Sequence, residues 1–465
     1  MNSLGRGKGI SVEYADPNVA IDTKNTSTST TLDSKITGTE TATLAKTVIT
    51  GQDATGAYYN AYVDKDGHQA VHIEDPISAF GDIEVVNKTP RLAEMFTYNL
   101  NTRKFTIDDT NNITGAVDVY RSMARCKVVV GEASAIADLQ SKDRIRYRPG
   151  QGITLRYTFM WEGLPLVTAL PDSYIGFIDN NNGVAIGYQG NATKELSLLH
   201  RNSATGSVVD TWTPQSSWDD PLDGTGSSGI TLNIQRLNII QIQWGYLGTA
   251  AFKYSIMNPG TGRFEVFYIQ KFPNTRTSPT FGNPSLPFRI RNANGSTTQG
   301  STAILSASYA GFVDGEVDRV GALPNASSHE QTSITTENNV LSVRCDSTYQ
   351  SKTQTNLILP KKVSIATIGG NRPILIRILK NPTISGVTWV AVNTSTSIAS
   401  TSTTQGTITG GELVNAFVMY QDTSQTLDLS GLNIFLSPGE WLTVSAQTSG
   451  TGIDAFATIS WLEDI

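Results

Sequence analysis

Cysteine and long apolar runs are scarce in this chain of 465 residues. The two cysteines, Cys126 and Cys345, exclude a disulfide framework, and they leave open whether a single long-range bridge joins them. No stretch reaches the roughly 18 apolar residues of a membrane-spanning helix. The first residues also lack the apolar core of a secretory signal. We therefore expect a chain that is made in a cytoplasm and stays soluble or assembles there.

Charge is the second shortage. Charged residues make up 16% of the chain, against roughly 25% in ordinary soluble domains. The net charge of −6 gives no attraction for nucleic acid. Hydroxyl and amide side chains take the place of the charges, and surfaces of this kind suit large contacts between subunits. Composition alone leaves both assembly and simple compositional drift open.

Motifs for catalysis and for metal binding are missing as well. The chain has no GxSxG, P-loop or zincin motif. The four histidines (His68, His72, His200 and His329) are scattered, and on a strand His68 and His72 would lie roughly 13 Å apart. We therefore expect no catalytic, cofactor-binding or metal-binding residues, no cofactor, and structural or exposed roles for the histidines.

The chain is rich in alternating apolar residues separated by Gly, Asn, Asp and Pro turns. Two such sets are Leu155, Tyr157, Phe159 and Trp161, and Ile240, Ile242, Trp244 and Tyr246. A two-residue period puts each set on one face of a half-buried strand. Repeated from about Ala57 to the last residues, the pattern predicts an all-β protein of tandem β-sandwich or jelly-roll domains. Only residues 133–140 resemble a short helix.

Changes in pattern divide the chain into segments. They predict an extended N-terminal arm (1–50), a β-hairpin lead-in (51–84), a central jelly-roll-like sandwich (85–320) and a C-terminal sandwich (331–465). The polar arm either orders against a neighbouring subunit or remains a flexible tail. The hairpin turns at Asp64–Gly67, and Gly321–Glu330 reads as a linker, so residues 331–465 should fold alone. Thr394–Thr409 is expected to be a Ser/Thr loop or weak strand, either a binding loop or a solvated connection.

Two acidic loops are candidates for chemistry. Asp179–Gly183 resembles the front half of a calcium loop but lacks the later glutamate, so a Gly-closed turn between two strands is the better interpretation. Trp218–Gly224 contains three carboxylates, which could bind calcium or cleave glycosidic bonds. A turn capped by aspartate side chains is the simpler interpretation, and we favour it.

Basic and aromatic residues give two weaker signals. Arg144, Arg146 and Arg148 alternate on what resembles one face of a strand, where they could bind phosphate, but pairing with carboxylates explains them better. Trp212, Trp218 and Trp244 could stack on sugars, although buried aromatics are commoner in a sandwich core.

Several phrases of the sequence resemble virion structural proteins of large DNA viruses and tailed phages. They are Ile77–Asp82, Arg146–Gly152, Ser217–Gly224, Gln243–Gly248 and the closing Trp461–Asp464. The resemblance implies a particle component such as a capsid vertex (penton), spike or fibre protein, and it carries over no functional residues.

We therefore expect a surface-exposed structural protein of a virus particle that is not an enzyme. Its partners would be copies of itself (a trimer or a pentamer), other capsid or tail proteins and a host-surface glycan, without nucleic acid or a membrane span. The alternative is a carbohydrate-binding or glycan-cleaving β-sandwich module, suggested by the tryptophans and the acidic loop from Trp218.

Overall fold

The computed structural model describes residues 49–52, 58–61, 88–129, 131–163, 172–190, 195–294, 301–315, 323–369, 371–432 and 434–464. Contacts divide the chain into two units, residues 1–72 and 73–465, each described by itself. In the first unit, β1 (Ile49–Gln52) pairs antiparallel with β2 (Tyr58–Ala61). The expected turn at 64–67, the strand expected after it and residues 1–48 of the expected arm lie outside the described residues.

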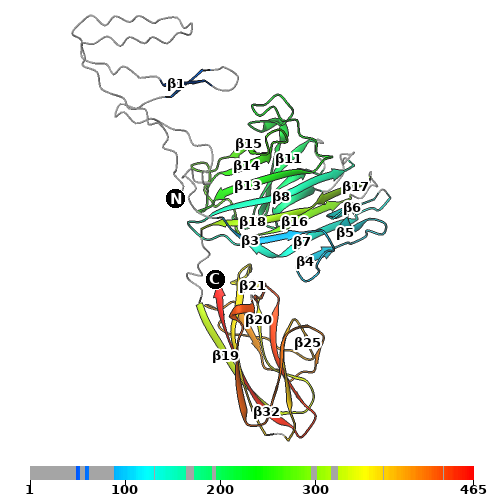
Figure 1. The fold of residues 1–465 in the computed structure, drawn as a ribbon, viewed down its shortest axis with the longest axis vertical. Coiled ribbons are helices and arrows are strands. Elements are labelled where there is room, and N and C mark those ends of the chain that lie inside the picture. The colour runs from blue at the N-terminus through cyan, green and yellow to red at the C-terminus, as the bar shows by residue number, and fades with distance from the viewer. Residues whose placement is uncertain are drawn as a thin grey trace, which may run out of the picture. The chain divides into compact units, whose positions relative to one another are not determined.

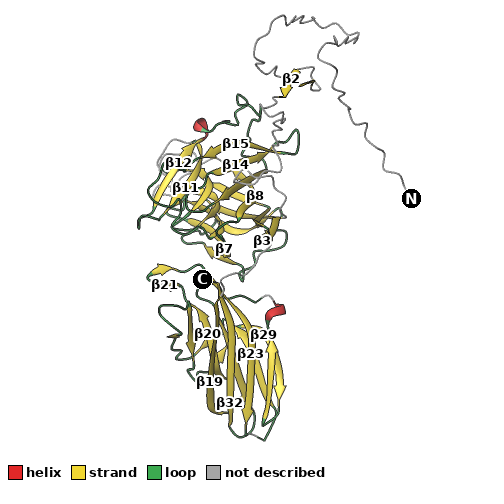
Figure 2. Ribbon diagram, turned by 90° about the vertical axis from the view of Figure 1, so that its left-hand side faces the viewer, coloured by secondary structure: helices red, strands yellow, loops and turns green. Residues whose placement is uncertain are grey.

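In the second unit, the described residues form strands joined by turns (Figure 1). Helix is limited to two short 3₁₀ turns, η1 (Gln215–Ser217) and η2 (Ser430–Leu432), drawn red in Figure 2. The predicted all-β class is therefore confirmed.

The central sandwich consists of two facing sheets. The seven-stranded sheet runs in the order β12 (Val209–Pro214), β11 (Leu196–Asn202), β10 (Gly183–Tyr188), β9 (Ser173–Ile178), β16 (Leu286–Ala293), β7 (Ile136–Ile145) and β4 (Phe105–Asp108). The nine-stranded sheet contains β15 (Phe264–Gln270), β14 (Phe252–Met257), β13 (Asn238–Gly245), β8 (Gly152–Glu162), β17 (Thr302–Ser306), β6 (Met123–Val128) and β5 (Ala116–Tyr120), with β18 (Ser308–Asp314) pairing with β8 and β3 (Lys88–Met95). Tyr157 on β8 donates a hydrogen bond to the Ile175 carbonyl on β9 (3.1 Å), and this bond ties the two sheets across their shared core.

The C-terminal sandwich also has two sheets. The four-stranded sheet runs β19 (Leu323–Ile334), β32 (Ile453–Asp464), β23 (Leu357–Ile368) and β30 (Thr423–Asp428). The six-stranded sheet runs β26 (Val390–Ala391), β27 (Ala399–Ser402), β20 (Asn338–Cys345), β31 (Trp441–Thr448), β24 (Ile374–Lys380) and β29 (Glu412–Met419). Two short ribbons complete the fold: β21 (Thr348–Tyr349) with β22 (Lys352–Thr353), and β25 (Thr383–Ile384) with β28 (Ile408–Thr409).

Alternation in the sequence identified inward-facing residues correctly over long strands. The predicted sets on β8 and β13 are buried throughout, because inward side chains from both sheets fill one core. The predicted Ser/Thr segment 394–409 contains a turn followed by the short strands β27 and β28, with irregular chain between the two strands.

Three local predictions were wrong. Residues 133–140, which resemble a short helix, lead into β7 because their side chains complete the seven-stranded sheet. The expected linker 321–330 mostly forms β19, whose residues pair with β32 although their side chains are polar. The third prediction, from alternation in the sequence, is that Phe264, Val266 and Tyr268 share one face of a strand. A bulge in the pairing of β14 with β15 turns Phe267 into the core and leaves Val266 exposed, so the three side chains do not share a face.

Candidate functional site

The acidic loop after Trp218 is built from backbone caps. The two carboxylate oxygens of Asp220 accept the N–H groups of Leu222 (3.0 Å) and Ser228 (2.7 Å). Asp219 accepts the N–H of Ile269 (3.0 Å) and Asp223 accepts that of Thr225 (2.9 Å). Each carboxylate thus satisfies a backbone donor that strand pairing leaves free, as in the capped turn favoured from the sequence.

Electrostatics weigh against acid catalysis in this loop. Burial raises the pKa of Asp220, but the N–H groups of Ser228 and Leu222 outweigh burial and leave this pKa below its ordinary value. The Thr225 hydroxyl, followed by its N–H, lowers the pKa of Asp223. Because a glycosidase acid needs a raised pKa to stay protonated, these carboxyls are poor candidates for that role.

The three tryptophans considered as sugar platforms differ in how far their indoles are exposed to solvent. Trp218 is buried against Phe267 (ring centroids 4.7 Å apart), and its Nε1 donates to the Thr213 carbonyl (3.1 Å). Trp244 lies fully inside the core. Only Trp212, on β12, keeps a partly exposed indole.

The Asp179–Gly183 segment is the predicted hairpin turn between β9 and β10. One Asp179 oxygen accepts the N–H groups of Asn181 (2.7 Å) and Asn182 (2.8 Å), and the other pairs with Arg144 (2.6 Å). Gly183 has a φ of 147°, and this region of backbone conformation favours glycine. The carboxylate is already fully engaged, which supports the turn over calcium binding.

The alternating arginines do not share one strand face, because β7 ends at Ile145. Arg144 pairs with Asp179, as expected of a carboxylate-paired arginine. Arg146, beyond the strand, donates to the Thr355 carbonyl (3.3 Å). We find no phosphate cradle in this arrangement.

Histidine and cysteine have structural surroundings. His200 is buried among Phe252, Phe272 and Phe281, and its Nε2 lies 2.8 Å from the Thr280 carbonyl oxygen. Burial lowers the pKa of His200 to about 4, although the Thr280 carbonyl opposes this shift. His68 and His72 lie outside the described residues, whereas His329 lies on β19.

Both cysteines are buried free thiols, Cys126 in the central core and Cys345 in the C-terminal one. Burial raises the pKa of Cys126 well above its ordinary value and that of Cys345 to about 12. Both thiols are therefore protonated and unreactive at neutral pH. Across the described part of the chain, no group of three or more His, Cys, Asp and Glu side chains is suited to a metal ion.

The outer face of the seven-stranded sheet places Trp212, one of the candidate sugar platforms, near polar residues that the sequence did not single out. Arg201 on β11 makes two bonds to Asp210 on β12 (2.8 and 2.7 Å) and donates to the Tyr174 hydroxyl (3.2 Å). Trp212 faces Leu199 two register positions along the same strand pair, and therefore lies on the same face of the sheet as Asp210. A partly exposed indole therefore lies on the same sheet face as a fixed carboxylate–guanidinium pair, which is chemistry that suits a hydroxylated ring.

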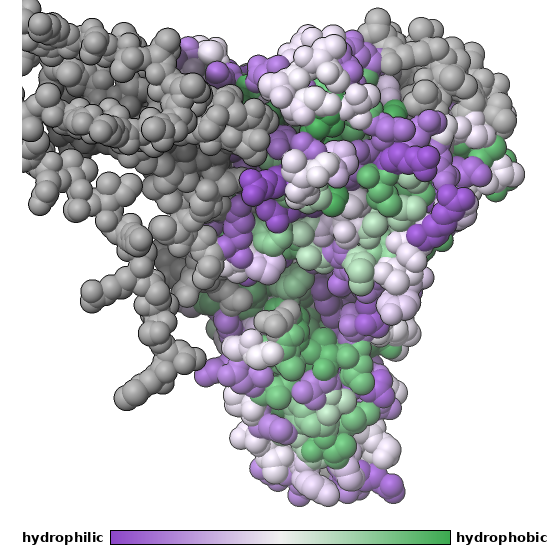
Figure 3. Space-filling view, turned by 45° about the horizontal axis from the view of Figure 1, so that its top comes forward, coloured by the Kyte–Doolittle hydropathy of each residue, from purple (hydrophilic) through white to green (hydrophobic). Residues whose placement is uncertain are grey.

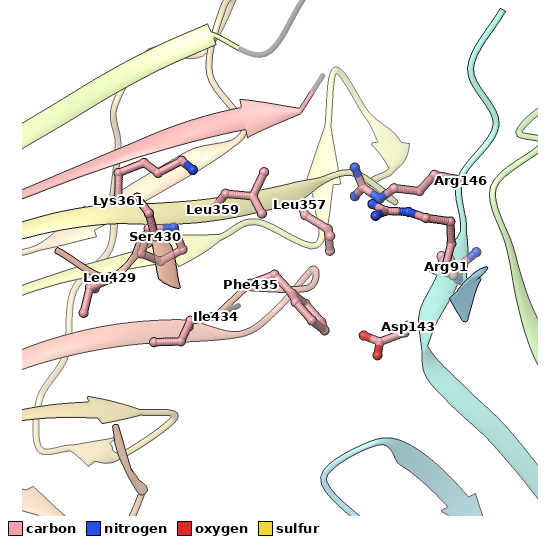
Figure 4. A pocket seen from close by; sticks show the side chains of 12 residues that line it. Arg91, Asp143, Arg146, Leu357, Leu359, Lys361, Leu429, Ser430, Ile434 and Phe435 are labelled. Carbon is pink, nitrogen blue, oxygen red and sulfur yellow. The ribbon is translucent and has the colours of Figure 1, made fainter. Parts of the chain in front are cut away.

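A cavity of about 320 Å³ lies within the second unit (Figure 4). Leu357, Leu359, Pro360, Leu429, Ile434 and Phe435 form its apolar lining, and Arg91, Asp143, Arg144, Arg146, Lys361 and Ser430 form its polar lining. Arg144 and Arg146 already bind Asp179 and the Thr355 carbonyl, and burial raises the pKa of Asp143. Two of the arginines in the polar wall are thus engaged with other parts of the chain, and we assign the cavity no ligand.

The outer strand β29 of the C-terminal sandwich is a different kind of surface. It ends the six-stranded sheet, so one side of its backbone has no strand partner among the described residues. Leu413 and Val418 are each 57% exposed and Tyr420, just beyond the strand, is 68% exposed. Apolar surface is visible over the C-terminal sandwich in the lower part of Figure 3. The apolar, uncharged run after Glu412 is visible in the sequence. That the strand is an edge follows only from the order of strands in the sheet.

Comparisons with known proteins add little. No family model and no curated protein matches the chain. Among solved structures, it is similar to arcelin-5, a lectin-like defence protein from Phaseolus vulgaris, with 8% identity over 48% of this chain and 99% of that one (TM-score 0.29). It is also similar to an endo-1,3-beta-glucanase from Streptomyces sioyaensis, with 9% identity over 49% and 97% (TM-score 0.29). Lectin I from Ulex europaeus matches with 8% identity over 48% and 97% (TM-score 0.30). Likenesses at these scores carry no argument about function, which rests here on the side chains themselves.

No helix of the described chain is both long enough and apolar enough to cross a membrane.

Proposed function

We propose that this protein is a non-catalytic structural component of a virus particle, exposed at its surface, that acts by subunit assembly. The observation that carries the proposal is the open apolar edge of β29, because an unprotected edge strand is a template for pairing with another chain. The resemblance of Arg146–Gly152 and of the closing Trp461–Asp464 to virion proteins supplies the viral setting. The capped carboxylates after Trp218 support a non-enzymatic role.

The assembly would contain several copies of this chain in contact with other capsid or tail proteins. A capsid vertex, spike or fibre would close as a trimer or a pentamer, and its subunits would be made in the host cytoplasm before entering the virion. Closed symmetry of this kind is the usual state of homo-oligomers.

Mass spectrometry of purified particles tests this proposal. We expect peptides of this chain in stoichiometric amount with the other particle proteins, and light scattering of the purified chain should give an oligomer. The proposal would be overturned if this chain were absent from the particle, or if the purified chain were monomeric at every concentration. Release of reducing sugar from any glycan, abolished by Asp220→Asn, would contradict the non-enzymatic part.

Carbohydrate binding is a second candidate, favoured by Trp212 beside the Asp210–Arg201 pair. The indole would stack on the apolar face of a sugar ring, while Asp210 and Arg201 would bind its hydroxyls. Glycan-array binding that Trp212→Ala removes would support this function. Tyr98→Ala is a matched control, because Tyr98 is an exposed aromatic in the connection between β3 and β4, and β4 lies at the opposite edge of the sheet from β12. Loss of binding in both variants would speak against a site at Trp212.

A further inference from the structure

The described edge strands of the sandwiches differ in how they are protected against pairing. Edges are normally blocked by charges, proline, bulges or short length. β12 carries Asp210 and ends at Pro214, and β26 has two residues. β15 contains Glu265 and a bulge, β4 ends at Asp108, and β5 contains Asp118. β3, which pairs only with β18, contains Pro90 and Glu94, β30 ends at Asp428, and β19 contains Pro324 and Glu330. Each of these edges therefore has at least one protective device.

β29 has such devices only at its start. Glu412 opens the strand and pairs with Arg103 (2.7 Å), and a bulge at Val414 shifts the register against β24. From Val414 to Tyr420 the chain reads VNAFVMY, without charge, proline or glycine. This composition is typical of segments that pair edge to edge.

The two faces of the strand are clearly distinguished. Phe417 and Met419 face the core of their own sandwich. Ala416 and Val418 are exposed and stand opposite Arg377 and Leu375 on β24. The free backbone edge is thus flanked on its outer face by small and apolar side chains that a partner strand would cover.

We propose that β29 pairs antiparallel with β29 of a second copy of this chain, about a two-fold axis through Phe417. This inference rests on the proposed assembly function and names the contact that carries it. The axis sets Ala416 opposite Val418 and Asn415 opposite Met419 of the other copy. Side chains directly opposite each other then share a face, as an antiparallel ladder requires.

A second copy fits this edge better than an unrelated partner because the segment is self-complementary. No charged residue lies between Val414 and Tyr420, so within this segment the two-fold operation places no like charges opposite each other. Glu412 falls outside the paired segment, where Arg103 already neutralises it. The contact is isologous, so it joins copies in pairs and adds to any ring contact that closes a trimer or pentamer.

Sedimentation equilibrium of the full chain tests the contact through Val418→Lys. The substitution puts two lysines beside the two-fold axis, and lysine is the residue that natural edges use against pairing. We expect the molecular mass of the oligomer to halve, with the dissociation constant raised about tenfold or more. Because Val418 is 57% exposed, the monomer should keep its melting temperature.

Gln425→Lys is the matched control, since Gln425 is exposed on β30, the edge strand of the other sheet. Gln425→Lys should leave the molecular mass of the oligomer unchanged. If Val418→Lys leaves the molecular mass of the wild-type oligomer unchanged, the β29 contact is overturned, whereas the assembly function stands. If that variant also has a lowered melting temperature, the edge of β29 is covered by another segment of the same chain. A wild-type chain that is monomeric at every concentration would overturn both.

Discussion

The two sandwiches fill their cores with different chemistry. The central core is dominated by aromatic rings, such as Phe288, which stacks on Tyr309 with centroids 4.1 Å apart and also contacts Phe96, Tyr157 and Phe177. The C-terminal core is almost entirely Ile, Val, Leu and Ala, with Trp461 as its fully buried aromatic side chain among the described residues. Large rings span the gap between broad sheets and lock one another in place, whereas branched aliphatic side chains suit the close packing of a smaller sandwich.

The sandwiches also differ in how they hold a buried carboxylate. Asp138 on β7 pairs with Arg289 (2.9 Å) and Arg291 (2.7 Å), so its charge is balanced by cations. Glu463 on β32 instead accepts four neutral donors at 2.7–2.8 Å, from Asn325, Ser397, Ile398 and Trp461. One site therefore depends on an ion pair, and the other on a hydrogen-bond network that joins two strands, β19 and β32, to the loop before β27.

Expressing the C-terminal sandwich as a separate fragment tests most directly whether the two sandwiches fold independently. Because β19 begins at Leu323, we expect residues 321–465 to fold alone with a cooperative transition and β-type circular dichroism. Residues 331–465 lack most of β19 and leave the edge of β32 unpaired, so we expect that fragment to aggregate or unfold. Equal melting temperatures for the two fragments would show that β19 is dispensable.

Core truncations should affect each sandwich separately. Phe288→Ala should cost about 4 kcal/mol in the central sandwich, and Ile376→Ala about 3 kcal/mol in the C-terminal one, since the ring leaves the larger cavity. Calorimetry should then show two transitions, each lowered by one variant only. Tyr98→Ala, at an 89% exposed position, should change stability by less than about 0.5 kcal/mol. A single transition that both variants lower would refute independent unfolding.

The buried carboxylates should respond unequally to loss of charge. Asp138→Asn should destabilise by about 3 kcal/mol or more, because two partly or fully buried guanidinium groups lose their counter-ion. Glu463→Gln should lower the free energy of unfolding by about 2 kcal/mol. The bonds to the charged carboxylate become weaker bonds to a neutral amide, and one N–H of the new amide faces another hydrogen-bond donor. Chemical denaturation measures both values. Asp118, whose side chain is 39% exposed in its ion pair with Arg125, is the least buried of the three carboxylates. Asp118→Asn should therefore cost at most about 1 kcal/mol, and an equal loss in all three would contradict the burial argument.

Acid should weaken the central sandwich through His200. Its pKa falls from 6.5 to about 4 on folding because burial disfavours the charged ring, so the unfolded chain binds more protons between these values. The stabilising contribution is complete above pH 6.5 and is lost as the pH falls toward 4, by about 3 kcal/mol in all. Thermal melts at several pH values should show this slope in the central transition. His200→Phe should flatten it, and an unchanged slope would assign the effect to carboxylates instead.

The sequence alone determined the all-β class, most inward-facing positions and the capped nature of the acidic turns. These properties are local: a two-residue period assigns faces within one strand, and an aspartate caps backbone donors a few residues away. The bulge at Phe267 was invisible because it depends on the partner strand. The strand at 323–334 was missed because its polar side chains resemble a linker.

Only the tertiary structure decided which strands are edges, which carboxylates meet cations and which tryptophan stays exposed. Arg201, Asp210 and Trp212 come together because β11 and β12 pair at the rim of a sheet. The apolar run of β29 looks like any core strand in the sequence, and only sheet order leaves its outer side open. The physical reason is that backbone pairing and burial join residues far apart in the chain, whereas periodicity describes neighbours.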